Sequence, residues 1–94
     1  MEFEWDETKN RANIRKHGVS FITATRIFEK PFLIRRDDRK QYGEDRYISV
    51  GDVDGVAVLV VAHTDRGGRT RLISARPASR RERQAWYEHI RQTA

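Results

Sequence analysis

The chain has 94 residues, enough for one compact domain and too few for two. It contains no cysteine, which excludes disulfides, thiol catalysis and thiolate metal sites. Its 19 lysines and arginines against 14 acidic residues give a net charge of +5. Most of these cations are arginines, whose planar guanidinium can bind a phosphate through two parallel hydrogen bonds.

No segment predicts export or membrane insertion. The sequence begins with alternating acidic and apolar residues rather than the basic and apolar regions of a signal peptide. Its longest apolar run, Val56 to Ala62, is too short to cross a bilayer. We therefore expect a cytoplasmic protein with no membrane association, organised as a single domain over residues 1–94.

The first predicted elements are a short strand and a polar helix. Residues 1–5 alternate like an edge strand, Asp6 occupies the position of a helix N-cap, and Gly18 is placed to end the helix. Apolar side chains within this helix are few. One helix face instead carries polar residues at spacings of three and four, namely Lys9, Asn13, Lys16 and His17. This face is either solvated or one wall of an anion site.

A second helix is predicted between Ser20, a capping residue, and Pro31, which stops it. Its core-facing residues repeat at helical spacing: Phe21, Ala24, Ile27 and Phe28. A strand is then predicted at Phe32–Arg36, followed by a polar loop over residues 37–43.

Three further strands are predicted at Arg46–Val50, Val56–His63 and Arg69–Arg76, separated by turns at residues 54–55 and 66–68. They should form an antiparallel meander, with the nearly all-apolar second strand in the middle of the sheet. Along the last strand, simple alternation predicts two faces, one with Arg71, Ile73 and Ala75 and the other with Leu72, Ser74 and Arg76.

The final predicted element is a helix that begins with a capping box formed by Ser79 and Glu82. It continues to about Gln92 and carries a narrow apolar stripe that includes Trp86 and Ile90. The predicted order is β-α-α-β-β-β-β-α. This order indicates an α+β fold in which helices pack on a small antiparallel sheet.

Several classes of enzyme chemistry lack the residues they need. The histidines His17, His63 and His89 are dispersed, and the adjacent Asp37 and Asp38 are better explained as loop residues than as magnesium ligands. We therefore predict no metal site and no cofactor. No glycine-rich phosphate loop precedes a helix, and no serine has the neighbours of a nucleophile elbow.

Cleavage of RNA by its own 2′-hydroxyl needs neither metal nor cofactor, only a base, an acid and cations that stabilise the phosphorane. The chain holds suitable side chains where strands and helix ends could converge: Lys16, His17, Glu44, Arg46, Arg71, Arg76 and Glu82. Structural roles compete, because Lys16 and His17 suit the negative end of a helix dipole and Glu82 suits the capping box. Arg71 and Arg76 stand out, since a charge within a packed strand usually has a partner or a ligand.

The whole pattern resembles the BrnT toxin family. The resemblance covers nearly the whole chain and preserves order and spacing, through Phe3-Glu4-Trp5-Asp6, Lys9, Asn13, Lys16-His17-Gly18-Val19-Ser20-Phe21, Ala24, Phe28, Tyr42-Gly43-Glu44, Arg46, Arg71-Leu72-Ile73-Ser74-Ala75-Arg76, Ala78-Ser79 and Glu82-Arg83.

The resemblance implies a RelE-like fold, ribonuclease activity that arrests translation, and neutralisation by a cognate BrnA-type antitoxin encoded beside the toxin. It implies contact with DNA only through the antitoxin, and it leaves open whether the complex is an oligomer. The candidate catalytic positions carried over are Lys16, His17, Arg71, Arg76 and Glu82.

The preferred hypothesis is a metal-independent endoribonuclease toxin. In it, Arg71 and Arg76 hold the scissile phosphate, His17 or Glu82 transfers protons, and Lys16 adds positive charge. A second hypothesis is a basic nucleic-acid-binding or regulatory module without catalysis, which would bind RNA or DNA in a salt-sensitive way. A third is a protein-binding component whose basic face meets an acidic partner.

Overall fold

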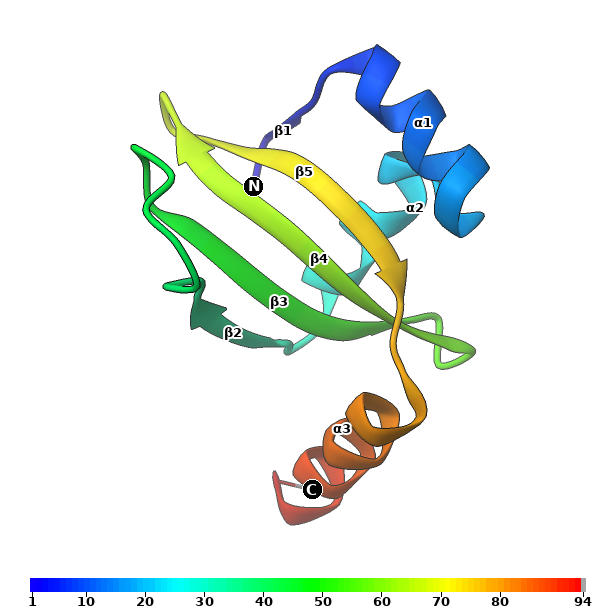
Figure 1. The fold of residues 1–94 in the computed structure, drawn as a ribbon. Helices are drawn as coiled ribbons and strands as arrows, with labels where there is room; N and C mark the ends of the chain where they lie inside the picture. Colours follow the sequence, from blue (N-terminus) through cyan, green and yellow to red (C-terminus); the bar gives the residue numbers. More distant parts are fainter. Residues whose placement is uncertain (94) are drawn as a thin grey trace.

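Five strands form one sheet with helices on both faces (Figure 1). The computed structural model describes residues 1–93. Its elements are, in order, β1 (Phe3–Glu4), α1 (Glu7–His17), α2 (Phe21–Ala24), the 3₁₀ helix η1 (Thr25–Glu29), β2 (Leu33–Arg36), β3 (Arg46–Val53), β4 (Ala57–Arg66), β5 (Arg69–Pro77) and α3 (Arg80–Thr93).

The strand order across the sheet is β1-β5-β4-β3-β2. Strands β2 to β5 form an antiparallel meander, and β1 pairs in parallel with β5 at the sheet edge. The predicted α+β class, meander and edge strand are confirmed. No helix within residues 1–93 combines the length and apolar character needed to span a bilayer.

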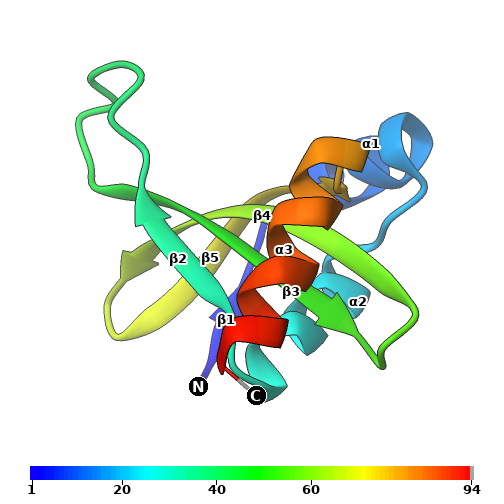
Figure 2. The same cartoon turned by 90° about the horizontal axis from the view of Figure 1, so that it is seen from below.

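Each face of the sheet has its own core because β4 alternates its apolar side chains between them. Leu59 and Val61 face α1, α2 and η1, where they pack with Phe21, Ile27 and other residues of the larger core. Val58 and Val60 face α3, where they pack with Trp86. Figure 2 shows α3 lying over this face of the sheet. A strand buried on both faces requires the continuous apolar run that the sequence shows.

The side-chain faces predicted for β5 are wrong. A bulge interrupts the pairing of β4 with β5, so that Ala62 pairs with Ser74 whereas His63 pairs with Leu72. The extra residue reverses the alternation at this point. Leu72 therefore packs with Ala75 in the larger core, while Ser74 and Arg76 lie on the face that carries α3.

The second predicted helix is also shorter than expected. Its α-helical part covers only Phe21–Ala24, and the chain continues as the 3₁₀ helix η1. At the junction the hydroxyl of Thr25 donates to the carbonyl of Ile22 at 2.6 Å. Such side-chain bonds compete with the backbone ladder of an α-helix. The predicted cap at Ser20 is confirmed, since its hydroxyl accepts from the N–H of Thr23.

Two buried asparagines, rather than apolar side chains, attach α1 to the rest of the fold. The amide nitrogen of Asn13 donates to the carbonyls of Val19 (2.8 Å) and Ala75 (2.7 Å), and its oxygen accepts from the N–H of Ala75. The side-chain oxygen of Asn10 accepts from the N–H of Phe21 at 2.8 Å. The polar stripe predicted on α1 is therefore partly structural, because Asn13 is one of its members.

Candidate functional site

The sheet face beneath α3 is only partly covered. In the uncovered part, strand register places Arg46 of β3 beside Thr64 of β4, and Thr64 beside Arg71 of β5. The adjoining register places Arg35 of β2 in the same row of side chains as Ser74 of β5, across Ile48 and Ala62. Arginines from three strands therefore border this open part of the sheet.

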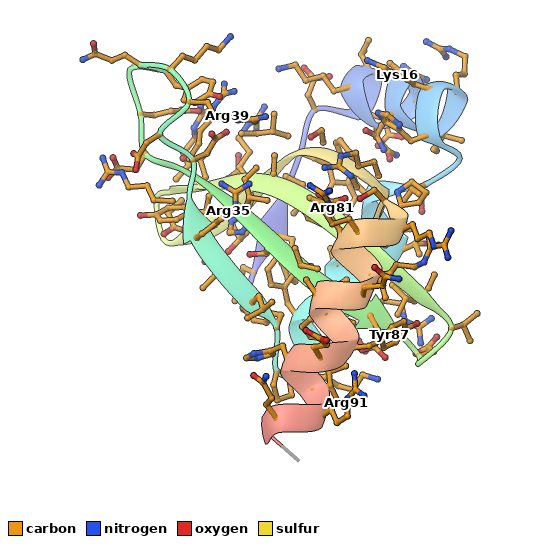
Figure 3. All side chains as sticks on the ribbon, turned by 60° about the horizontal axis from the view of Figure 1, so that its bottom comes forward. Lys16, Arg35, Arg39, Arg81, Tyr87 and Arg91 are labelled. Carbon is orange, nitrogen blue, oxygen red and sulfur yellow. The ribbon has the colours of Figure 1, made fainter. Side chains whose placement is uncertain are left out.

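A small depression of about 90 Å³ lies within this face. We call it the arginine depression, and its lining residues are Arg35, Arg39, Ile48, Val60, Ala62, Ser74 and Arg76. The floor is apolar apart from Ser74, and three guanidiniums surround it. Figure 3 shows Arg35 on β2 and Arg39 in the loop that follows it, on the same side of the sheet.

Arg76 is held in place by Glu82. Nη1 of Arg76 donates to Oε1 of Glu82 at 2.8 Å, and Nη2 donates to Oε2 at 2.9 Å. The same carboxylate accepts from the N–H of Ser79, so the predicted capping box is confirmed. The hydrogen bond from Arg76 is the main cause that lowers the pKa of Glu82 to about 2. Glu82 is therefore ionised at neutral pH.

Arg39 is held by a second carboxylate. Nε and Nη2 of Arg39 donate to the two carboxylate oxygens of Asp37 at 2.8 and 2.9 Å, and the hydroxyl of Tyr42 donates to Asp37 at 3.0 Å. These donors hold the pKa of Asp37 well below its usual range, the bond from Arg39 being the largest cause. The Asp37 side chain is buried, whereas that of Arg39 is 70% exposed. The guanidinium is thus oriented yet open to a ligand.

Arg71 does not line the arginine depression. It lies near the start of β5, where Nη1 donates to Glu4 of β1 at 2.7 Å. Arg71 and Arg76 pair with Thr64 and Val60 of β4, and because of the bulge in β5 this separation of four residues on β4 corresponds to roughly 13 Å along the strands. The two predicted phosphate-binding arginines are held by different carboxylates, Glu4 and Glu82.

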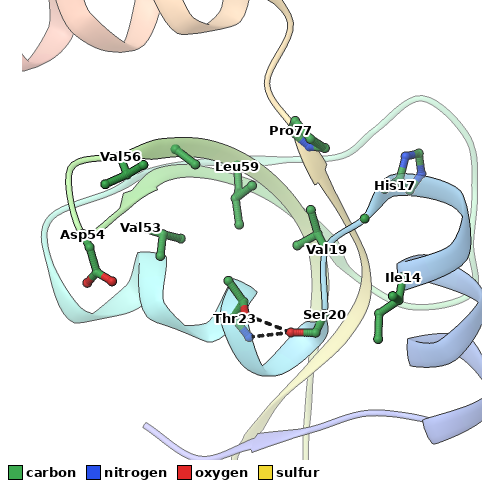
Figure 4. Close-up of a pocket in the computed structure, with 12 residues that line it drawn as sticks. Ile14, His17, Val19, Ser20, Thr23, Val53, Asp54, Val56, Leu59 and Pro77 are labelled. Atoms are coloured by element: carbon green, nitrogen blue, oxygen red, sulfur yellow. Dashed lines mark hydrogen bonds between the residues drawn. The ribbon is translucent and has the colours of Figure 1, made fainter.

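Lys16 and His17 lie together in the last turn of α1, away from the depression. His17 lines a separate cavity of about 620 Å³ on the α1 side of the sheet, and Pro77 also lines it (Figure 4). Pro77 directly follows Arg76, so the cavity and the depression approach the end of β5 from opposite faces. The depression is lined by no histidine among the described residues.

Glu44 and Arg46, also singled out in the sequence, pair with each other at 3.2 Å. The Arg46 guanidinium lies 4.1 Å from the centre of the Tyr42 ring, a cation–π contact. Within residues 1–93 no group of three or more histidines and carboxylates is arranged to hold a metal ion.

Arg35 and Arg39 were not among the site residues predicted from the sequence. The signal for Arg35 was present, since it is a charge within a predicted strand, the same criterion that selected Arg71 and Arg76. Arg39 carried no such signal. Its orientation depends on the burial of Asp37, whose backbone N–H donates to the carbonyl of Arg46 in the neighbouring strand.

Comparisons with known proteins identify the family. The sequence model of the family described as "Ribonuclease toxin, BrnT, of type II toxin-antitoxin system" matches residues 5–82. The chain is also similar to the crystal structure of the Brucella abortus ribonuclease toxin BrnT, with 26% identity and a TM-score of 0.64 over 85% of this chain and 99% of that one. No curated protein sequence matches the chain. Since the family match spans most of its length, the chain belongs to the BrnT ribonuclease toxin family of type II toxin–antitoxin systems.

Proposed function

We propose that this chain is a metal-independent endoribonuclease whose RNA cleavage inhibits translation, and that a cognate BrnA-type antitoxin neutralises it. Membership of the BrnT family supports ribonuclease activity and the existence of an antitoxin. The observation that carries the site assignment is the arginine depression. There, Arg39 and Arg76 are each oriented by a carboxylate at two points, beside Arg35, which forms no ion pair with any described residue.

The reaction supported by these residues is transesterification within the RNA. The 2′-oxygen attacks the adjacent phosphorus while its proton passes to a base, and the bond from phosphorus to the 5′-oxygen breaks. The leaving 5′-oxygen takes a proton from an acid. The products are a 2′,3′-cyclic phosphate and a 5′-hydroxyl, and the pentavalent intermediate carries extra negative charge. Fixed cations beside that charge are the largest contribution a protein can make without a metal.

Arg76 is the residue we assign to the scissile phosphate, with Arg39 and Arg35 beside it. Glu82 positions Arg76, and because it is ionised it can accept a proton and cannot donate one. Arg71, roughly 13 Å away along β5, would bind a neighbouring phosphate of the same RNA strand. In this proposal Arg71 and Arg76 contact neighbouring phosphates rather than the same one.

His17 and Lys16 remain candidates for proton transfer and for additional positive charge. Neither lines the arginine depression, so proton transfer by His17 requires the scissile phosphate itself to lie at the end of β5, between Arg76 and the end of α1. Lys16 can add positive charge by contact with a phosphate further along the RNA.

The test is incubation of the purified, antitoxin-free protein with an end-labelled RNA in the presence of EDTA. The proposal predicts cleavage that EDTA leaves unchanged, products with cyclic phosphate ends, and no cleavage at a nucleotide whose 2′-hydroxyl is replaced by hydrogen. Addition of the protein to a cell-free translation reaction should stop synthesis in proportion to cleavage of its RNA. Loss of cleavage in EDTA with recovery in Mg²⁺ would contradict metal independence.

The second candidate function is a basic RNA-binding module without catalysis. It is favoured by one observation, that both carboxylates beside the depression are ion-paired and no imidazole lines it within the described residues. In the same experiment, such a module would bind the RNA in a salt-sensitive way and leave it uncleaved.

A further inference from the structure

An apolar cavity opens on the sheet face opposite the arginine depression. It has a volume of about 620 Å³ and lies between the end of α1, the segment that leads into α2, and the turn that joins β3 to β4 (Figure 4). Its apolar lining comes mainly from Ile14, Val19, Val53, Val56, Leu59 and Pro77. The proposed reaction at the depression uses none of these side chains.

The rim of this cavity exposes large apolar side chains to solvent. Val56 is 84% exposed and Ile14 is 42% exposed. Both line the cavity, one on each side of it. Single exposed apolar residues are ordinary, but a hollow with apolar walls and an apolar rim marks an interaction site. An apolar cavity with an exposed apolar residue on each side also suits the insertion of apolar side chains from a partner segment.

The charges around the cavity are positive. The last turn of α1, which supplies Ile14 and His17 to the lining, also carries Arg15 and Lys16. Asp54, the carboxylate among the described lining residues, is neutralised by Arg26 at 2.9 Å. The chain as a whole carries a net charge of +5. A partner that complements this surface therefore combines apolar side chains with acidic ones.

We propose that this cavity binds the cognate antitoxin, through a segment whose apolar side chains enter the cavity and whose acidic side chains pair with the last turn of α1. The inference rests on the proposed neutralisation by an antitoxin and adds the surface and the chemistry of the contact. A segment bound there covers His17 and borders Pro77, the residue next to Arg76. The bound segment thus obstructs an RNA that passes from Arg76 toward the end of α1, without contact with Arg35 or Arg39 on the opposite face of the sheet.

The absence of cysteine from the chain allows a direct test. The single-cysteine variants Val56→Cys and Ile14→Cys place a thiol at the cavity, and its rate of alkylation shows whether the cavity is covered. Tyr87→Cys on α3 and Ile34→Cys on β2 are matched controls, since both side chains are more than half exposed and lie outside the cavity. Alkylation of each thiol is timed for the free toxin and for its purified complex with the antitoxin encoded beside it.

The proposal predicts that alkylation at positions 14 and 56 slows by about tenfold or more in the complex, while positions 34 and 87 react at unchanged rates. Fast alkylation at 14 and 56 in an intact complex, with protection at 34 or 87, would overturn it. Ribonuclease activity is measured on each free variant. If the free toxin leaves RNA intact, the proposed function is contradicted. If the free toxin cleaves RNA but the antitoxin protects thiols outside the cavity from alkylation, only the proposed docking site is contradicted.

Two further variants separate the apolar and ionic parts of the contact. Val56→Asp should weaken antitoxin binding by about tenfold or more because it places a charge in the apolar contact. Arg15→Glu should weaken binding at low salt and have little effect at high salt, where surface charges are screened. Lys9→Glu, on the same helix but remote from its last turn, is the charge-matched control for Arg15→Glu. Equal effects of Lys9→Glu and Arg15→Glu would argue against a local acidic contact.

Discussion

Arg76 and Glu82 form a two-point ion pair that joins the end of β5 to the first turn of α3, with N–O distances of 2.8 and 2.9 Å. Glu82 simultaneously accepts from the backbone N–H of Ser79 and so begins the helix. One carboxylate thus fixes both the helix and the guanidinium that faces the arginine depression. The capping role and the positioning role can be separated by substitution.

Glu82→Gln should lower RNA cleavage while leaving the fold nearly unchanged. Glutamine still caps the helix through its amide oxygen, but its neutral amide holds Arg76 less firmly. We expect kcat to fall by about tenfold or more, since small misplacements of a catalytic group have effects of this size, with little change in KM. The free energy of unfolding should change by less than about 1 kcal/mol.

Glu82→Ala is the control for that experiment. It removes the cap as well, so the free energy of unfolding should fall by about 1 kcal/mol in addition to the loss of activity. If Glu82→Gln cleaves RNA at the rate of the unaltered protein, Glu82 is a capping residue only.

Asn13→Leu should destabilise the protein strongly. The substitution leaves the N–H of Ala75 and the carbonyls of Val19 and Ala75 without their buried partner. Because each unsatisfied buried group costs about 1–3 kcal/mol, we expect a loss of about 3 kcal/mol or more in urea unfolding. Lys9→Ala, an exposed change on the same helix, should have little effect. A loss below about 1 kcal/mol for Asn13→Leu would show that these bonds are replaced by others.

Gly51→Ala should destabilise the packing of β3 against η1. An added Cβ would lie 2.9 Å from Cβ of Ile27 and 3.3 Å from both the carbonyl oxygen of Ile27 and Cβ of Phe32. Overpacking of this kind costs about 1–3 kcal/mol. Gly18→Ala is a useful comparison, because its Cβ meets no atom within 4 Å and its cost of about 1 kcal/mol arises from a φ of 72° alone. Gly51→Ala should therefore have a lower thermal unfolding temperature than Gly18→Ala.

Stability should fall as pH decreases below about 6.5 because of His63. This ring is buried, lies 2.7 Å from the Ser49 hydroxyl and stacks on Tyr47. Burial lowers the pKa of His63, against a smaller opposing effect of Asp65. The unfolded chain therefore binds a proton, in this pH range, that the folded chain does not, and stability is lost at up to about 1.4 kcal/mol per pH unit.

Urea unfolding between about pH 7.5 and 5.5 measures this slope. A His63→Gln variant should have a smaller slope over the same range. Asp37 and Glu82 do not affect the slope in this pH range. Because their pKa values are lowered in the folded protein, their contribution to stability is lost only when the pH falls below about 4. An identical slope in the variant would assign the pH dependence to other groups.

The sequence predicted the elements well and the side-chain faces less well. Caps, turns and periodicity are local signals, so the limits set by Asp6, Gly18, Ser20 and Ser79 agree with the structure. The bulge opposite His63 arises from pairing between strands and has no local signal, which is why simple alternation assigned Leu72 to the wrong face.

The same distinction applies to the candidate site. Arg76 and Glu82 were each selected for a local reason, and their ion pair follows from the short connection between β5 and α3. Arg35 and Arg39 reach the depression through the pairing of β2 with β3 and through the burial of Asp37. His17 was grouped with the arginines by residue type, whereas the fold places it in the cavity on the other face.

The most direct test of the active-site assignment compares RNA cleavage by Arg76→Ala and Arg26→Ala, each purified without antitoxin and confirmed to be folded. Both variants remove an arginine that is ion-paired to a carboxylate, but Arg26 pairs with Asp54 beside the apolar cavity. We expect Arg76→Ala to lose about a hundredfold or more in kcat, the effect of removing one fixed charge-stabilising group, while Arg26→Ala cleaves at the unaltered rate. Equal rates for the two variants would contradict the assignment of the active site to the arginine depression.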